Sequence, residues 1–256
     1  MAKTIAIAGK GGTGKTTIAS LIVDYLTKNN ETPVLAIDAD PDSNLGTLLG
    51  VKPEKSIGEL RNEVLEDMKD FPPGMTKASY LEAGLHEIIE ESEGFDLISM
   101  GRGEGSGCYC ALNNLIRKFH QDLTPSYKWV IIDNEAGLEH ISRRTTSNID
   151  ILIVVVSNNP ISLNTARSIE KITRKLKNKV EQKYIVSNML KEERKESIQQ
   201  LAEETNMQYL FNVPRDEKLE EAIFNGESLR ELKSPAKEGI FLMMEKIGGK
   251  NGNSKS

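Results

Sequence analysis

The sequence predicts an α/β fold in which helices flank a doubly wound, mainly parallel sheet. Two runs of consecutive apolar and mostly β-branched residues, 129–132 and 151–156, are typical of strands that are buried on both faces of such a sheet. Stretches with apolar residues at helical spacing separate the apolar runs along the chain. Because strands and helices alternate in this way, we expect the strands to lie parallel to one another.

The individual elements follow from the same patterns. Strands are expected at the apolar runs 4–8, 33–37, 95–100, 129–132, 151–156 and 184–186, and helices at 16–28 and 112–119. The polar and acidic stretch 51–92 is interrupted by Phe71-Pro72-Pro73-Gly74, so we expect irregular helices and a mobile loop there. We interpret residues 1–247 as a single domain, and residues 248–256, which are only Gly, Lys, Asn and Ser, as a disordered tail.

The composition argues against several classes of protein. Hydrophobic residues make up 38% of the chain and charged residues 28%, and no apolar run approaches the roughly 18 residues that a membrane span requires. A formal net charge of −5 argues against a general nucleic-acid surface. The first residues lack the basic and long apolar regions of a signal peptide. We therefore expect a cytoplasmic protein that binds neither membrane nor nucleic acid.

A glycine-rich turn between the first strand and the first helix matches the phosphate-binding P-loop. Consecutive backbone N–H groups in such a loop curl around phosphate oxygens, and the following helix adds the positive end of its dipole. Lys15 is expected to add a full charge at the β- and γ-phosphates, and the Thr16 hydroxyl to bind Mg²⁺. The alternative is a glycine turn that merely joins a strand to a helix. The expected nucleotide-binding residues here are Gly9, Lys10, Gly11, Gly12, Thr13, Gly14, Lys15, Thr16 and Thr17.

A second lysine, Lys10, stands near the start of this loop. With it the loop resembles the deviant Walker A loop, GKGGxGKT, of the MinD, ParA and nitrogenase iron protein superfamily, within the SIMIBI class of P-loop NTPases. In that superfamily this lysine acts on the nucleotide of a neighbouring subunit, so the resemblance implies a homodimer that forms around ATP, with Lys10 and Lys15 both catalytic. The alternative for Lys10 is a solvated side chain.

The acidic loop that follows the second strand, Asp38-Ala39-Asp40-Pro41-Asp42, resembles switch I of the same superfamily. The resemblance implies that Asp40 orients the attacking water and that Asp38 holds the hydration shell of Mg²⁺. Phosphoryl transfer needs mainly positioning and charge neutralisation, which these carboxylates can supply. Asp42 could instead cap the following helix.

Further nucleotide contacts are expected at the ends of later strands. Asp133 ends an apolar strand in the Walker B arrangement, and Gly137 follows at the DxxxG spacing of a γ-phosphate sensor in switch II. Asn134 and Glu135 depart from the superfamily pattern, in which small or apolar residues precede the alanine. A carboxylate at a strand end can also be a simple helix cap. By resemblance, adenine contacts fall on Asn188 and on Pro214 of the Val213-Pro214 pair, although either residue could serve only as a turn.

The two cysteines of the chain, Cys108 and Cys110, are one residue apart in a glycine-rich stretch. A disulfide between them would close a very tight ring against the preferred geometry. Two thiolates cannot complete a tetrahedral metal site within one chain, but a twofold dimer supplies four. We therefore expect a shared Zn²⁺ or Ni²⁺ site, and thiolates alone do not distinguish these ions. A pair of ordinary reduced thiols is the alternative.

Three segments narrow the resemblance: Gly107-Cys108-Tyr109-Cys110, Asp40-Pro41-Asp42-Ser43, and 136–140 (Ala-Gly-Leu-Glu-His) followed by Arg143. Together they resemble the CooC-type accessory ATPases of carbon monoxide dehydrogenase. With the related AcsF-type factors, that family implies ATP hydrolysis coupled to nickel supply, with carbon monoxide dehydrogenase or acetyl-CoA synthase as client. His140 is a further candidate nickel ligand, with a structural role as the alternative.

Two other functions stay open on the sequence alone. An iron–sulfur reductase or scaffold like the nitrogenase iron protein would place a [4Fe–4S] cluster on four dimer cysteines, but that protein draws its ligands from well-separated loops. A MinD or ParA positioning ATPase would act on a membrane or on DNA. The membrane form would need a basic amphipathic C-terminal helix, whereas residues 239–244 are followed by a polar, glycine-rich tail.

Overall fold

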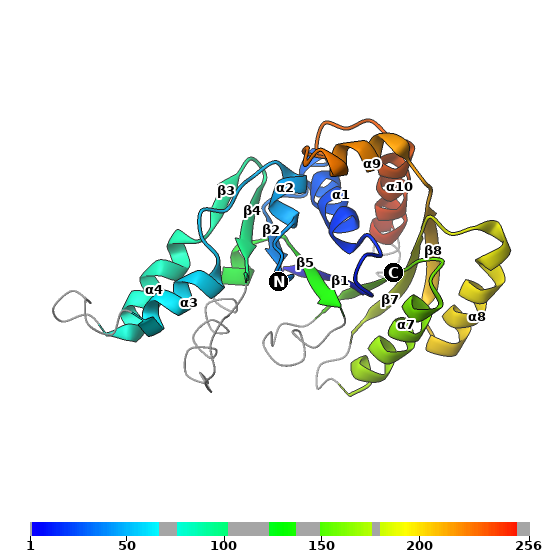
Figure 1. Ribbon diagram of the computed structural model, residues 1–256, viewed down its shortest axis with the longest axis horizontal. Coiled ribbons are helices and arrows are strands. Elements are labelled where there is room, and N and C mark those ends of the chain that lie inside the picture. Colours follow the sequence, from blue (N-terminus) through cyan, green and yellow to red (C-terminus); the bar gives the residue numbers. More distant parts are fainter. Residues whose placement is uncertain (1, 67–75, 102–122, 137–148, 176–179, 250–256) are drawn as a thin grey trace, which may run out of the picture.

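The computed structural model describes residues 2–66, 76–101, 123–136, 149–175 and 180–249 (Figure 1). The strands are β1 (Lys3–Gly9), β2 (Val34–Asp38), β3 (Glu90–Ser92), β4 (Phe95–Ser99), β5 (Trp129–Ala136), β6 (Ile151–Val156), β7 (Gln182–Asn188) and β8 (Gln208–Val213). The helices are α1 (Lys15–Lys28), α2 (Leu45–Leu49), α3 (Ile57–Glu66), α4 (Lys77–Glu87), α7 (Pro160–Thr173), α8 (Lys195–Thr205), α9 (Glu217–Phe224) and α10 (Pro235–Gly249), with short 3₁₀ turns at Thr124–Ser126 and Glu192–Arg194.

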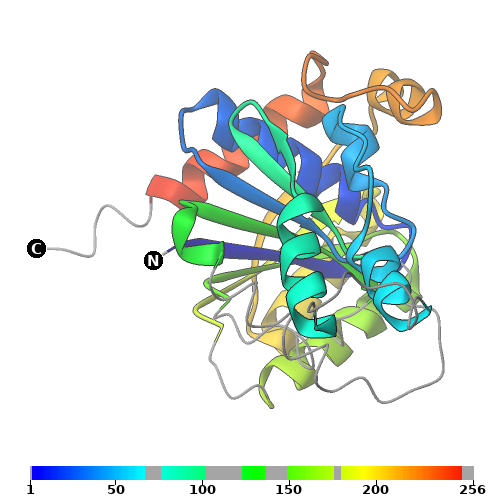
Figure 2. The same cartoon turned by 90° about the vertical axis from the view of Figure 1, so that its left-hand side faces the viewer.

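One eight-stranded sheet forms the centre of the described structure, in the order β3-β4-β2-β5-β1-β6-β7-β8. Every neighbouring pair is parallel except β3 with β4, at the edge. Helices lie on both sides of the sheet (Figures 1 and 2). The predicted doubly wound α/β fold is therefore confirmed.

Each central strand buries alternate side chains on opposite faces, as the pleat requires. On β1, Ile5 and Ile7 pack with helices α1 and α10, whereas Ala6 and Ala8 face the cluster that α7 and α8 complete. On β2, Leu35 belongs to a third cluster, which α3 and α4 cover. The runs of consecutive apolar residues in the sequence thus reflect burial on two faces.

The structure extends several sequence-based boundaries. Strands β3 and β8 were not expected as strands, and β7 reaches two residues further, to Asn188. Helix α10 continues to Gly249, two residues past the expected end of the domain, which is within the usual spread of helix ends. The expected helix at 112–119 and residues 250–256 lie outside the described residues. None of the helices in the described ranges is long and apolar enough to cross a bilayer.

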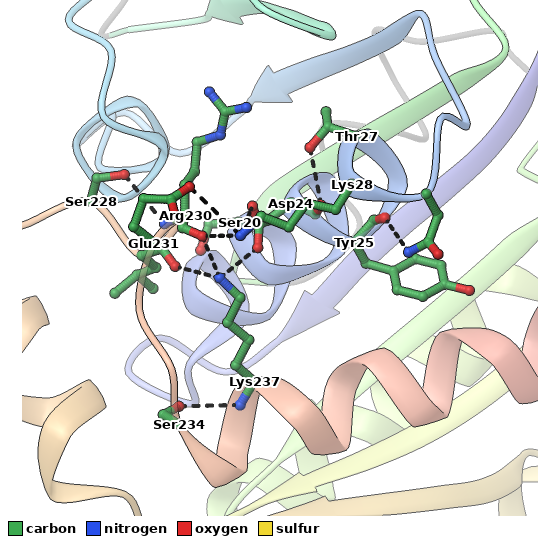
Figure 3. A network of polar contacts seen from close by, with 12 residues as sticks. Ser20, Asp24, Tyr25, Thr27, Lys28, Ser228, Arg230, Glu231, Ser234 and Lys237 are labelled. Carbon is green, nitrogen blue, oxygen red and sulfur yellow. Dashed lines mark hydrogen bonds and ion pairs between the residues drawn. The ribbon is translucent and has the colours of Figure 1, made fainter.

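A buried ion pair ties α1, the helix that follows the P-loop, to α10 (Figure 3). Lys237 Nζ lies 2.6 Å from Asp24 Oδ2, and the two side chains are only 8% and 1% exposed. The same ammonium donates to the carbonyls of Leu229, at 2.9 Å, and Arg230, at 2.6 Å. Lys28 Nζ approaches the other Asp24 oxygen at 3.4 Å. The ammonium of Lys237 therefore holds three chain segments together.

Candidate nucleotide-binding site

The predicted site residues that the structure describes lie at the carboxyl ends of parallel strands. Gly9 ends β1, Asp38 ends β2 and Asn188 ends β7. Asp133 lies in the second half of β5, three residues before its end. Pro214 directly follows β8, whose last residue, Val213, pairs in register with Asn188. Open α/β sheets bind ligands at this edge. Topology thus brings together residues that are far apart in the sequence.

The P-loop wraps around the carbonyl of Lys10. This oxygen accepts from Thr13 N at 3.3 Å, from Thr13 Oγ1 at 2.8 Å and from Lys15 Nζ at 3.4 Å. Lys15 is only 5% exposed although it is a lysine. Among the described residues Lys15 forms no ion pair, and burial of a lysine without one is costly unless it binds an anion. The phosphate cradle itself stays a prediction.

Two glycines of the loop are required by close approaches of other chain segments. A Cβ atom on Gly9 would overlap the backbone carbonyl of Val155 on β6. Gly14, the N-cap of α1, has a left-handed φ of 91°, and a Cβ there would overlap the side-chain amide of Asn188. The Asn188 amide donates to the Thr13 carbonyl at 3.0 Å. Asn188, expected at the adenine, therefore supports the P-loop backbone.

Two carboxylates lie side by side beneath the loop. Asp38 and Asp133 are partners in the register of β2 and β5, and they are 1% and 0% exposed. Among the described residues neither carboxylate oxygen of Asp133 has a hydrogen bond of full geometry, although the Thr16 hydroxyl is close enough to lower its pKa. Asp38 accepts from the backbone N–H groups of Leu45, at 2.8 Å, and Asp40, at 3.1 Å.

Burial raises the pKa of both carboxyl groups. For Asp133 the pKa rises to about 7, because desolvation and the nearby charge of Asp38 outweigh the Thr16 hydrogen bond and the charge of Lys15. For Asp38 desolvation raises the pKa to about 6, against the two backbone hydrogen bonds. Two buried carboxylates that form no ion pair among the described residues fit a divalent ion. Carboxylate and hydroxyl oxygens are the donors that Mg²⁺ prefers.

The switch I turn is held by its own backbone. Ser43 N donates to the Asp40 carbonyl at 3.0 Å, and Asp42 N to Asp40 Oδ1 at 3.1 Å. Ser43 has a left-handed φ of 50°, and its hydroxyl accepts from Ser99 Oγ at 2.7 Å. Non-glycine residues in this conformation are strained and cluster at switches. The alternative role for Asp42 is wrong, because Asn44 occupies the N-cap of α2 and Asp38 accepts from the first helical N–H.

A groove of about 640 Å³ borders this turn. Pro41 and Ser43 form one wall, α3 contributes Asn62, and Ser99 and Gly101 at the end of β4 close it. The switch I turn thus contributes two residues to the lining of this groove. Neither Ser43 nor Ser99 was predicted as a site residue. Ser43 was noted as the last residue of the segment Asp40-Pro41-Asp42-Ser43, and no sequence pattern pointed to Ser99.

Several predicted site residues lie outside the described part of the chain. They are Gly137 of switch II, the cysteines Cys108 and Cys110, and His140 and Arg143. Among the described residues no three His, Cys, Asp or Glu side chains are grouped to hold a metal ion. The phosphate and Mg²⁺ site and the cysteine site therefore both stay predictions.

Comparison with known proteins identifies the fold family. The model of the CobQ/CobB/MinD/ParA nucleotide-binding domain family matches residues 4–229. The chain belongs to this family. Together with the P-loop geometry, this membership makes it a nucleotide-binding ATPase.

Two curated relatives of this ATPase cover two thirds or more of the chain. An uncharacterized ATP-binding protein of Methanocaldococcus jannaschii is 40% identical over 253 residues, which cover 98% of this chain and 99% of the relative. The carbon monoxide dehydrogenase accessory protein CooC of Rhodospirillum rubrum is 34% identical over 187 residues, which cover 67% of this chain and 69% of the relative. The second comparison supports the superfamily and leaves the CooC type as a narrower proposal.

Solved structures share the fold of this ATPase at low identity. A ParA family ATPase of Chlorobium tepidum has a TM-score of 0.71 at 18% identity, with 95% of this chain and 99% of that chain covered. The septum site-determining protein MinD of Pyrococcus horikoshii, complexed with Mg-ADP, has a TM-score of 0.69 at 18% identity, with 98% of each chain covered. These likenesses establish the fold of the ATPase domain.

The raised pKa of Asp133 gives a testable effect on stability. The carboxyl group takes up its proton more readily in the native state than in the unfolded state, so its charge destabilises the free protein above pH 7. The native pKa of about 7, against 3.8, corresponds to an upper limit of about 4 kcal/mol. Asp133→Asn should therefore raise the melting temperature of the nucleotide-free protein at pH 8, and the gain should shrink as the pH falls from 7 to 4. Thermal melts across this range measure it. A variant less stable than wild type at pH 8 would contradict the pKa shift.

Proposed function

We propose that this chain is a Mg²⁺-dependent ATPase that dimerises around ATP and assists nickel insertion into carbon monoxide dehydrogenase or acetyl-CoA synthase. The observation that carries the nucleotide part is the buried Lys15 side chain, whose ammonium donates to the P-loop carbonyl of Lys10, close to the buried carboxylate pair Asp38 and Asp133. The nickel part is supported by the Cys108-x-Cys110 pair and by the 34% identity to an accessory protein of carbon monoxide dehydrogenase.

The residues divide the work of ATP hydrolysis. The backbone N–H groups of the P-loop and the N-terminus of α1 bind the phosphates, and Lys15 neutralises charge on the β- and γ-phosphates. Thr16, Asp38 and Asp133 would hold Mg²⁺ and its waters. When bound, Mg²⁺ supplies charge neutralisation of the phosphoryl oxygens. Asp40, in the switch I turn, orients the attacking water.

The dimer connects hydrolysis to the cargo ion. In this proposal Lys10 of each protomer reaches the nucleotide of the other, so ATP holds the two copies together. Closure brings two cysteine pairs onto the twofold axis, where four thiolates bind one Ni²⁺ or Zn²⁺ as cargo. Loss of the γ-phosphate opens the dimer and weakens this grip. Each chain alone offers only two of the four ligands.

Anaerobic titration with Ni²⁺ and with Zn²⁺ tests the cargo site. Wild-type protein with ATP should bind about one ion per two chains, because four thiolates complete one tetrahedral site. The Cys108→Ala/Cys110→Ala variant should lose the ion and keep its affinity for nucleotide. One ion per chain in a stable monomer would contradict the shared site. A brown, iron-containing dimer would instead favour the iron–sulfur alternative.

A further inference from the structure

Asn134 occupies an irregular position between the P-loop strand and the strand that carries Asp133. Ile7 of β1 pairs with Asp133 of β5, but two residues later Gly9 pairs with Ala136. Over this interval β1 advances from 7 to 9 and β5 from 133 to 136, so β5 carries one extra residue. Such a bulge locally disrupts the hydrogen-bond ladder and turns the bulged strand. Asn134 and Glu135 are the residues in this interval.

The Asn134 side chain bridges the two strands at the bulge. It is 1% exposed, and its amide donates to the Ile7 carbonyl at 2.9 Å, with a longer contact of 3.4 Å to the Ile132 carbonyl. Its Oδ1 is buried and has no hydrogen-bond partner among the described residues. A buried amide oxygen without a hydrogen bond destabilises the fold, so the presence of Asn134 here calls for an explanation.

The bulge lies where three parts of the nucleotide site meet. Asp133, one residue before Asn134, is tied to switch I because its carbonyl accepts from Ala39 N at 2.9 Å. Gly9, the partner of Ala136, is the first residue of the P-loop. By bonding the Ile7 carbonyl, the Asn134 amide links β5 to β1 beside Asp133. It can therefore set the position of the Asp133 carboxylate relative to the P-loop, which follows β1.

We propose that Asn134 is a positioning residue for the Mg²⁺-nucleotide complex. Its amide takes the place of a ladder hydrogen bond and sets the offset between Asp133 and the P-loop, so that the carboxylate faces the Thr16 hydroxyl. It acts through Asp133 and touches neither nucleotide nor ion. The inference rests on the Mg²⁺-dependent ATPase reaction proposed above.

Two substitutions and one control separate positioning from general stability. Asn134→Leu keeps nearly the same side-chain size without the donor, and Asn134→Ala removes the donor and most of the side chain. Leu201→Ala, on the buried face of α8, serves as the control because it should destabilise the protein away from the phosphate site. Calorimetry should measure nucleotide affinity in EDTA and in Mg²⁺, beside kcat and KM of ATP hydrolysis.

Both Asn134 variants should bind nucleotide in EDTA within about threefold of wild type, because the P-loop backbone remains. The gain in affinity on adding Mg²⁺, and kcat, should each fall about 10- to 100-fold, as expected when a residue behind a metal ligand is lost. Equal losses in EDTA and in Mg²⁺, or effects matching Leu201→Ala, would overturn the positioning role. Wild-type turnover that ignores Mg²⁺ would instead overturn the proposed reaction.

Discussion

Replacing Lys15 with alanine is expected to abolish nucleotide binding. Lys15 adds a full positive charge to the neutral backbone N–H groups with which the loop is proposed to bind its own phosphates. Charge-assisted hydrogen bonds contribute about 1.5–3 kcal/mol each. The loss of such contacts to two phosphates would therefore lower the affinity for nucleotide by about 100-fold or more. Calorimetric titration with ATP and ADP measures this loss.

The fold of the Lys15→Ala variant should survive. Among the described residues the ammonium donates to a loop carbonyl at the long distance of 3.4 Å, so the substitution removes a weak hydrogen bond from the free protein. Lys171→Ala, on the exposed face of α7, removes the same charge away from the loop and should leave affinity unchanged. Retained nucleotide binding in a folded Lys15→Ala protein would remove Lys15 from the proposed phosphate site.

Replacing Lys237 with methionine is expected to cause the largest loss of stability. The substitution leaves Asp24, only 1% exposed, without its nearest cation, and it removes one donor each from the carbonyls of Leu229 and Arg230 (Figure 3). Removing one partner of a buried ion pair typically lowers the free energy of unfolding by about 3–5 kcal/mol. Because Lys28 still contacts Asp24, we expect a loss of about 3 kcal/mol. Urea unfolding measures the change.

A double substitution tests the cause of that loss. In Asp24→Leu/Lys237→Met no charge stays buried, so much of the stability should return. Lys246→Met, on the exposed side of the same helix, should change the free energy of unfolding by less than about 0.5 kcal/mol. If the double variant is as unstable as Lys237→Met, the loss comes from packing and the buried charge is not its cause.

The sequence predicts the fold and the phosphate loop because both are local patterns. The P-loop from Gly9 to Thr16 and the apolar runs of the central strands are contiguous in the chain, and the structure places them as expected. Strand β8 was missed because its side chains are mostly half-buried at the sheet edge, which weakens the apolar pattern. The polar edge strand β3, of three residues, gave no signal.

Interactions between distant segments could not be predicted in the same way. The role of Asn134 depends on the register of β5 against β1, and Asn188 meets Gly14 only because β7 ends beside the P-loop. Nothing in the residues around Lys237 distinguishes it from an ordinary surface lysine. The packing of α10 against α1 buries it. Sequence patterns predict the helices, the strands and their buried faces, whereas these contacts follow from tertiary packing.

The mass of the protein in solution with ATP tests the account most directly. Asp40→Ala should slow hydrolysis and hold the ATP state, so light scattering should give twice the mass of the chain with ATP and the mass of one chain with ADP. Lys10→Ala combined with Asp40→Ala should bind ATP and stay monomeric, because the contact across the dimer is lost. A single-chain mass for the ATP-bound Asp40→Ala protein would contradict the ATP-dependent dimer, and with it the shared cysteine site.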